Sequence, residues 1–203
     1  MADINPTFQE PPGAIASFPS EEIASGLGNV VFLGITSEDD SAVDYHLITQ
    51  TVYSSVSGTR RTSAGTTTID FDTSAFNLPR TAKGTAFFSA GVGVNGADTI
   101  KLLVQLFHVD SGASETNITS EITTKNYTGT SGDTSTMMFI ALPMTQKHFK
   151  KGEFLRMRVK MTTTGSNAQD LGHDPKDQNF GTIVPGTKDT TIMTLVMSFR
   201  SEL

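Results

Sequence analysis

Hydrophobic and polar residues alternate with a period of two along much of this chain. The clearest case is residues 153–161, EFLRMRVKM, in which the intervening positions are Arg or Lys. The apolar residues on one face are Leu155, Met157, Val159 and Met161. A strand sends successive side chains to opposite faces of a sheet, so this alternation predicts a strand with one buried face and one solvated face.

Nine segments show such alternation or a compact run of β-branched, aromatic and aliphatic residues, and turn residues separate them. They are residues 29–35, 45–56, 66–71, 83–92, 99–109, 116–124, 136–142, 153–161 and 190–199. The run 136–142 is expected to stop at Pro143, and only residues 146–151 and a turn near Glu21 have helical character. The pattern therefore predicts an all-β fold with at most two short helices: an antiparallel β-sandwich, of the jelly-roll type.

The first 28 residues differ from the rest. Four prolines interrupt any regular element there, and the apolar residues are widely spaced. These apolar residues are Phe8, Ile15, Phe18 and Ile23. We therefore expect residues 1–28 to form an extended N-terminal arm, with these four side chains as assembly anchors on a neighbouring subunit, and residues 29–203 to form the β-sandwich domain.

The amino-acid composition and net charge of the chain limit the kinds of partner that it is expected to bind. The chain has no Cys, which excludes disulfides and thiolate metal sites, and its formal net charge is -6. An acidic surface repels phosphate, which argues against nucleic acid as a partner. No apolar run is long enough to span a membrane, and the start of the chain lacks the pattern of a signal peptide.

Two motifs resemble ligand-binding sequences but are better explained as ordinary loops. Residues 91–96, GVGVNG, match the dinucleotide fingerprint, but no βαβ pattern surrounds them, so we expect an inter-strand loop. Residues 37–44, SEDDSAVD, hold four carboxylates without the spacing of an EF-hand calcium loop, so we expect a solvated acidic loop.

A third polar cluster, GHDPKDQNF at residues 172–180, lies within a Gly- and Pro-rich stretch from Thr162 to Lys188. His173 and Asp174 suggest a metal or acid/base site, but a polar surface loop explains them as well. None of the four His forms a metal-binding motif. The sequence thus predicts no catalytic, cofactor or metal site, and a protein that is not an enzyme.

Three stretches resemble virion structural proteins of tailed bacteriophages. They are residues 66–90, TTTIDFDTSAFNLPRTAKGTAFFSA; residues 149–161, FKKGEFLRMRVKM; and residues 172–178, GHDPKDQ. The resemblance covers roughly residues 66–199 and carries no catalytic motif.

The resemblance implies a capsid-associated decoration or cement protein that is made in the host cytoplasm and stabilises the head exterior through subunit contacts. Its implied partners are the major capsid protein or other coat subunits, and copies of itself in a homo-oligomer, a trimer. Two alternatives stay open: a receptor- or glycan-binding β-sandwich module of a phage fibre, and a hydrolase on a jelly-roll scaffold.

Overall fold

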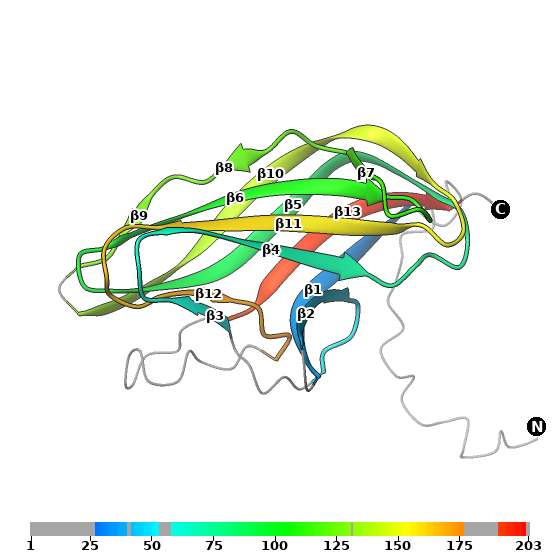
Figure 1. Ribbon diagram of the computed structural model, residues 1–203. Coiled ribbons are helices and arrows are strands. Elements are labelled where there is room, and N and C mark those ends of the chain that lie inside the picture. The colour runs from blue at the N-terminus through cyan, green and yellow to red at the C-terminus, as the bar shows by residue number, and fades with distance from the viewer. Residues whose placement is uncertain (1–26, 40–41, 53–57, 131, 177–190, 202–203) are drawn as a thin grey trace, which may run out of the picture.

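The computed structural model describes residues 27–39, 42–52, 58–130, 132–176 and 191–201, and every regular element within these ranges is a strand (Figure 1). The prediction of an all-β sandwich is confirmed. The described ranges contain no helix that is long and apolar enough to cross a membrane.

Hydrogen bonds join 13 strands into one sheet that folds over into two packed layers (Figure 1). The first layer holds β3 (Gly58–Arg61), β12 (Gln169–Gly172), β5 (Arg80–Asn95), β10 (Asp133–Phe149), β13 (Met193–Ser201) and β1 (Leu27–Asp39). The second layer holds β2 (Ala42–Ile48), β4 (Gly65–Thr73), β11 (Phe154–Thr163), β6 (Thr99–Val109), β7 (Glu115–Asn117), β8 (Ile122–Thr123) and β9 (Tyr127–Thr128). The β1–β2 hairpin carries the sheet from one layer to the other.

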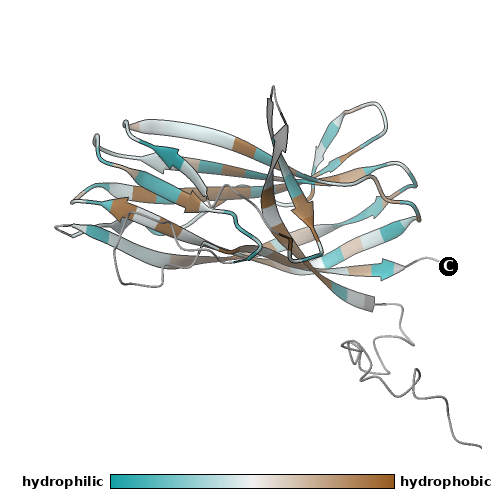
Figure 2. Ribbon diagram, turned by 90° about the horizontal axis from the view of Figure 1, so that it is seen from below, coloured by the Kyte–Doolittle hydropathy of each residue, from teal (hydrophilic) through white to brown (hydrophobic). Residues whose placement is uncertain are grey.

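The core lies between the layers, and strand alternation fills it from both sides. The four apolar residues predicted to face inward from β11 are all fully buried, as are Phe88 and Val92 of β5 and Leu102 and Val104 of β6. Hydrophobic and polar residues accordingly alternate along the strands in Figure 2. Local pattern and tertiary burial agree here because each strand has one neighbouring layer to pack against.

Pairing is antiparallel throughout the described strands except between β2 and β4. These two run parallel for a short stretch, from Tyr45 opposite Phe71 to Leu47 opposite Thr73. Beyond Leu47 and Thr73 the two strands separate, and a pocket lies at this opening.

Strand β10 is longer than its sequence predicts. It continues through Pro143, which lies opposite Thr85, and includes residues 146–149, so the helical character assigned to residues 146–151 is wrong. Among the described strands β10 pairs only with β5, so it is an edge strand. An edge strand tolerates Pro143, because the N–H that proline lacks is not needed for a second ladder. The expected turn near Glu21 lies outside the described residues.

Several predicted loops are also strands. Residues 91–95 extend β5, and only Gly96, with a φ of 71°, lies in the turn before β6; the expected inter-strand loop is therefore wrong, and a strand follows where a dinucleotide site needs a helix. Ser37–Asp39 and Ala42–Asp44 belong to the β1–β2 hairpin instead of an acidic loop. Strand β12 lies within the stretch 162–188 that lacked strand signals.

Candidate interaction surface and pocket

The outer face of the first layer carries an apolar row across four strands. Ala141 of β10 lies opposite Phe87 of β5, Phe87 lies opposite Val196 of β13, and Val196 lies opposite Val31 of β1. In the next row Phe139 lies opposite Ser89, whose hydroxyl is 2.6 Å from that of Thr194.

We call these seven residues the neutral face: Val31, Phe87, Ser89, Phe139, Ala141, Thr194 and Val196. None of them is charged. Phe139 is 73% exposed and Phe87 is 57% exposed, which is unusual for the largest apolar side chains of a folded domain. An exposed, uncharged and partly aromatic sheet face is the usual character of a protein–protein contact surface.

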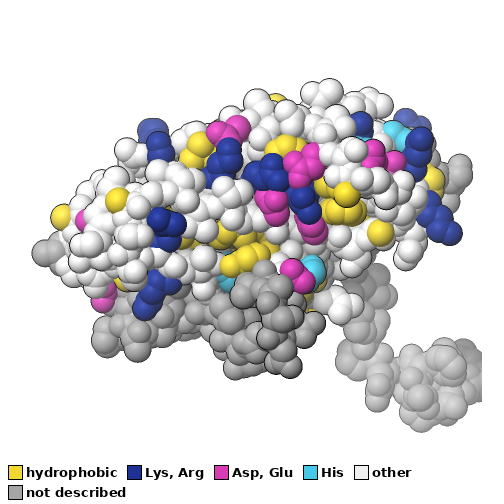
Figure 3. All heavy atoms as spheres, viewed as in Figure 1, with side chains coloured by type: hydrophobic (Ala, Val, Ile, Leu, Met, Phe, Trp, Pro, Cys, Tyr) yellow, Lys and Arg dark blue, Asp and Glu magenta, His cyan; other side chains and the backbone are white. Residues whose placement is uncertain are grey.

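The outer face of the second layer is charged instead. Arg158 and Asp70 are register partners of β11 and β4, and both side-chain oxygens of Asp70 accept hydrogen bonds from Arg158 at 2.7 Å. Glu115 of β7 accepts further bonds from Arg158, and Lys160 pairs with Glu121. Figure 3 shows these basic and acidic side chains gathered on the face that carries β4 and β11. In such cross-strand ion pairs each charge is compensated by its partner, and the charged side chains keep this face hydrated.

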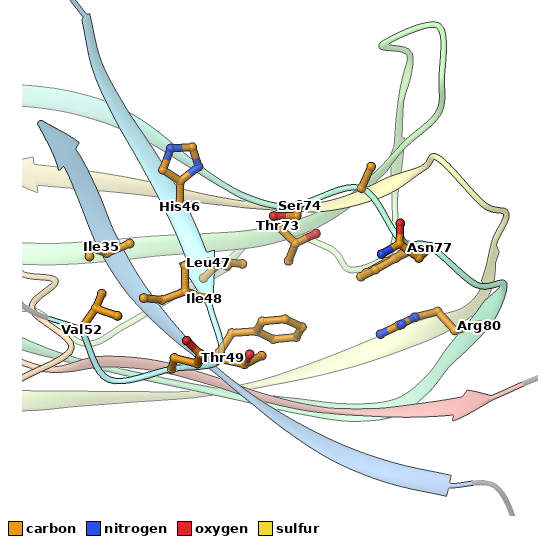
Figure 4. Close-up of a pocket in the computed structure, with 14 residues that line it drawn as sticks. Ile35, His46, Leu47, Ile48, Thr49, Val52, Thr73, Ser74, Asn77 and Arg80 are labelled. Atoms are coloured by element: carbon orange, nitrogen blue, oxygen red, sulfur yellow. The ribbon is translucent and has the colours of Figure 1, made fainter. Parts of the chain in front are cut away.

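A pocket of about 570 Å³ opens where β2 and β4 separate (Figure 4). Parallel pairing ends at Leu47 and Thr73, and β1 pairs with β2 only as far as Leu33 opposite Ile48. Beyond these points the chain after β4 turns away instead of continuing the ladder. The pocket is lined by Phe32, Ile35, His46, Leu47, Ile48, Thr49, Gln50, Val52, Thr73, Ser74, Ala75, Phe76, Asn77 and Arg80.

The cluster around His173 is buried, not a surface loop, so that expectation is wrong for residues 172–175. His173 Nδ1 lies 3.0 Å from Thr36 Oγ1, and its Nε2 lies 2.9 Å from Thr59 Oγ1. The ring also packs edge-on against Tyr45 and Phe71. Burial lowers the pKa of His173 to about 4. A neutral imidazole that contacts side chains of four strands, β1, β2, β3 and β4, is a structural element of the core.

The other sequence candidates are dispersed. His46 lines the pocket, His108 lies 2.7 Å from Glu153 and packs edge-on against the ring of Phe149, and His148 contacts Thr81. Within the described ranges no group of three or more His, Cys, Asp or Glu is placed to hold a metal ion. The predicted arm anchors, Phe8, Ile15, Phe18 and Ile23, lie outside the described residues.

Comparison with known proteins identifies the architecture only. No protein-family model matches the sequence, and a search of curated protein sequences gives no match. Among solved structures, a CocE/NonD family hydrolase from Staphylococcus aureus is 12% identical with a TM-score of 0.54, and the alignment covers 86% of this chain and 37% of the hydrolase. An aminopeptidase from a marine sediment Thaumarchaeota archaeon is 9% identical with a TM-score of 0.54, over 84% of this chain and 37% of the other.

These matches correct the prediction that the protein is not an enzyme. The same fold occurs within chains that are hydrolases, so the lack of a catalytic sequence motif does not separate this architecture from enzymes. The chain spans 37% of the length of each of these two hydrolytic enzymes, and at such identity the likeness is one of fold.

The neutral face was not predicted, although the sequence contains a signal for it. In residues 85–89 and 136–142 apolar residues occupy both parities of the strand, so Phe87 and Phe139 point outward while their neighbours Phe88 and Ile140 point inward. An apolar residue at the outward position of a half-exposed strand is the signal that indicates a contact face. The pocket had no such local signal, because its walls come from four separate segments.

Proposed function

We propose that this chain is a virion structural protein that associates with the capsid through subunit–subunit contacts, and that the neutral face is the surface through which it contacts further copies of itself. The observation that carries the proposal is the exposure of Phe87 and Phe139, in successive rows of the paired strands β5 and β10, on an uncharged sheet face. Burying such aromatic side chains is a main source of affinity in protein interfaces.

Charge favours a second copy as the occupant of this face. The chain carries a net charge of -6, so two copies repel each other wherever their acidic surfaces approach. The neutral face lets two copies meet without opposing like charges, whereas the ladder of Arg158, Asp70 and Glu115 on the other layer is already paired within one chain. A shared sheet face also buries the same residues on both partners.

The capsid partner rests on the resemblance of residues 66–90 and 149–161 to phage virion structural proteins. In this proposal the major capsid protein or another coat subunit binds elsewhere on the domain or through the arm, on the capsid exterior. The resemblance also implies a trimer. The neutral face alone does not account for a trimer, because a self-complementary face joins copies in pairs.

Sedimentation analysis of the purified chain tests the contact between copies. We expect a concentration-dependent oligomer that Phe139→Asp or Phe87→Asp converts to monomer, because each places a carboxylate within an apolar contact. Leu78→Asp is the matched control, since Leu78 is an exposed apolar residue, at 60%, outside the neutral face. Unchanged thermal unfolding of all three variants would show that the fold is intact.

Two results would contradict the proposal. A wild-type chain that stays monomeric at all concentrations and on purified shells would remove the neutral face as a contact between copies. An oligomer that Leu78→Asp weakens as much as Phe139→Asp does would place the contact elsewhere. Failure to bind purified phage shells would contradict the capsid role separately.

The fold comparison favours one second candidate, a hydrolase built on this β-sandwich scaffold. Its support is that the CocE/NonD family hydrolase and the aminopeptidase each contain this fold in 37% of their length. Hydrolysis of activated esters and of aminoacyl anilides by the purified chain, with a buffer blank, tests this candidate. Turnover above the blank that survives repurification would support it, and no turnover with either class would count against it.

A further inference from the structure

The pocket between β2 and the segment after β4 contains a positive charge that no carboxylate of the described residues pairs with. Arg80, the first residue of β5, lines the pocket, and Figure 4 shows its side chain pointing in from the side opposite Ile48 and Val52. Its Nε is buried and has no hydrogen-bond partner. None of the fourteen lining residues is acidic.

Three other arginines of the domain have carboxylate partners. Arg60, Arg156 and Arg158 each bind the carboxylate of an aspartate through two hydrogen bonds. Arg80 instead lies over the ring of Phe76, with 4.2 Å between its guanidinium carbon and the ring centre, and 5.4 Å from that of Phe199. Burial lowers the pKa of Arg80, and no carboxylate among the described residues offsets this effect. The rings cover the guanidinium but leave its hydrogen-bond donors free to bind an acceptor.

Seven of the thirteen other lining residues are apolar, and the polar ones are His46, Thr49, Gln50, Thr73, Ser74 and Asn77. Ile35, Leu47, Ile48 and Val52 supply aliphatic surface, and Phe32, a buried core residue, also lines the pocket. Thr73, a polar lining residue, already accepts a hydrogen bond from the backbone N–H of Leu155. The volume of about 570 Å³ is within the range, about 300–1,000 Å³, of small-molecule sites, which combine apolar walls with a few placed polar groups.

We propose that this pocket binds a small apolar ligand that carries a single carboxylate, such as a medium-chain fatty acid, with the carboxylate on Arg80 and the hydrocarbon chain along the aliphatic wall. A planar guanidinium matches the two oxygens of a carboxylate. A single cation also balances a single negative charge, whereas a phosphate dianion would stay half compensated. The inference is independent of the proposed role in a capsid.

Calorimetric titration of the full chain with decanoate and with decanol tests the proposal. The two probes share the hydrocarbon chain, so their difference measures the contribution of the carboxylate. We expect decanoate to bind one per chain and about tenfold more tightly than decanol, the size of a charge-assisted hydrogen bond. Arg80→Met should abolish this preference, and Arg80→Lys should retain part of it because the charge remains. Lys83→Met, on the same strand but outside the pocket lining, should leave it unchanged.

A second variant locates the site independently of charge. Ala75 is an exposed residue of the pocket wall, so Ala75→Trp should fill the pocket and abolish binding of both probes without disturbing the core. Thermal unfolding checks that each variant is folded. Equal affinity for decanoate and decanol, no binding of either, or a preference that survives Arg80→Met or Ala75→Trp would each overturn the proposal.

Discussion

Arg156 of β11 holds both carboxylate oxygens of Asp72, its register partner on β4, at 2.7 Å and 2.6 Å. The hydrogen bond with Asp72 is the main reason that the pKa of Arg156 is raised, with burial opposing it and Glu115 adding to it. Both side chains are about three-quarters covered, at 24% and 28% exposed, so solvent screens the pair only in part.

A double-mutant cycle with Arg156→Met and Asp72→Asn should therefore give a coupling free energy of about 1 kcal/mol, near the upper end for partly exposed pairs. Urea unfolding of the four proteins at low ionic strength measures it. Repeating the cycle in 1 M salt is the control, because screening should reduce the coupling. A coupling near zero at low salt would mean that the fork geometry adds nothing to stability.

His173 should make the fold sensitive to mild acid. Its pKa is about 4 in the folded chain and about 6.5 in the unfolded chain, so the unfolded chain binds an extra proton between these values. Stability is thus fully present above about pH 6.5 and is lost as the pH falls toward 4, by about 3 kcal/mol at most.

The free energy of unfolding as a function of pH measures this effect. His173→Gln is the comparison, because an amide can still hydrogen-bond to the hydroxyls of Thr36 and Thr59 but does not titrate. We expect the variant to be less stable at pH 7 and to lose less stability between pH 6.5 and 4. Parallel curves for the two proteins would show that His173 is not the group responsible.

Gly172 should not tolerate a side chain. A Cβ at this position would lie 2.5 Å from the carbonyl oxygen of Thr191 and 2.7 Å from its Cα, and both are backbone atoms that cannot turn aside. Gly172→Ala should destabilise the domain by about 1–3 kcal/mol, the usual cost of overpacking. Gly28→Ala is the matched control in a strand, because nothing lies within 4 Å of its added Cβ. Chemical denaturation of both variants checks the contrast, which fails if the two are equally stable.

The N-terminal arm gives a prediction from sequence alone. Burying one of its apolar anchors stabilises by roughly 1.5–3 kcal/mol, whereas ordering each residue costs on the order of 1–2 kcal/mol. Deleting residues 1–25 should leave the β domain folded and weaken attachment to other copies or to purified shells. Circular dichroism and shell-binding assays measure the two effects. Undiminished binding, or a chain that no longer folds, would contradict the role of the arm.

Alternation along the chain was enough to predict most of the long strands and the buried side of each, whereas β3 and β12 lie outside the predicted segments. In β11 the inward set from Leu155 to Met161 follows from alternation within nine residues, and β6 begins and ends where its pattern does. This information is local because strand geometry fixes the direction of each side chain from its neighbours alone. Predictions went wrong where tertiary pairing overrode the local signals, as at Pro143 on an edge strand and at Gly91 and Gly93 inside β5.

Which side chains meet across strands followed from the three-dimensional arrangement of the strands. Phe87 became part of an apolar row because register brings Ala141 and Val196 beside it from more than fifty and one hundred residues away. Arg80 packs against the rings of Phe76 and Phe199 with no carboxylate partner among the described residues, and His173 became a core residue because β12 lies between β3 and β5. Such relationships depend on strand order and register, which are set by the simultaneous packing of both layers and leave no periodic trace in the chain.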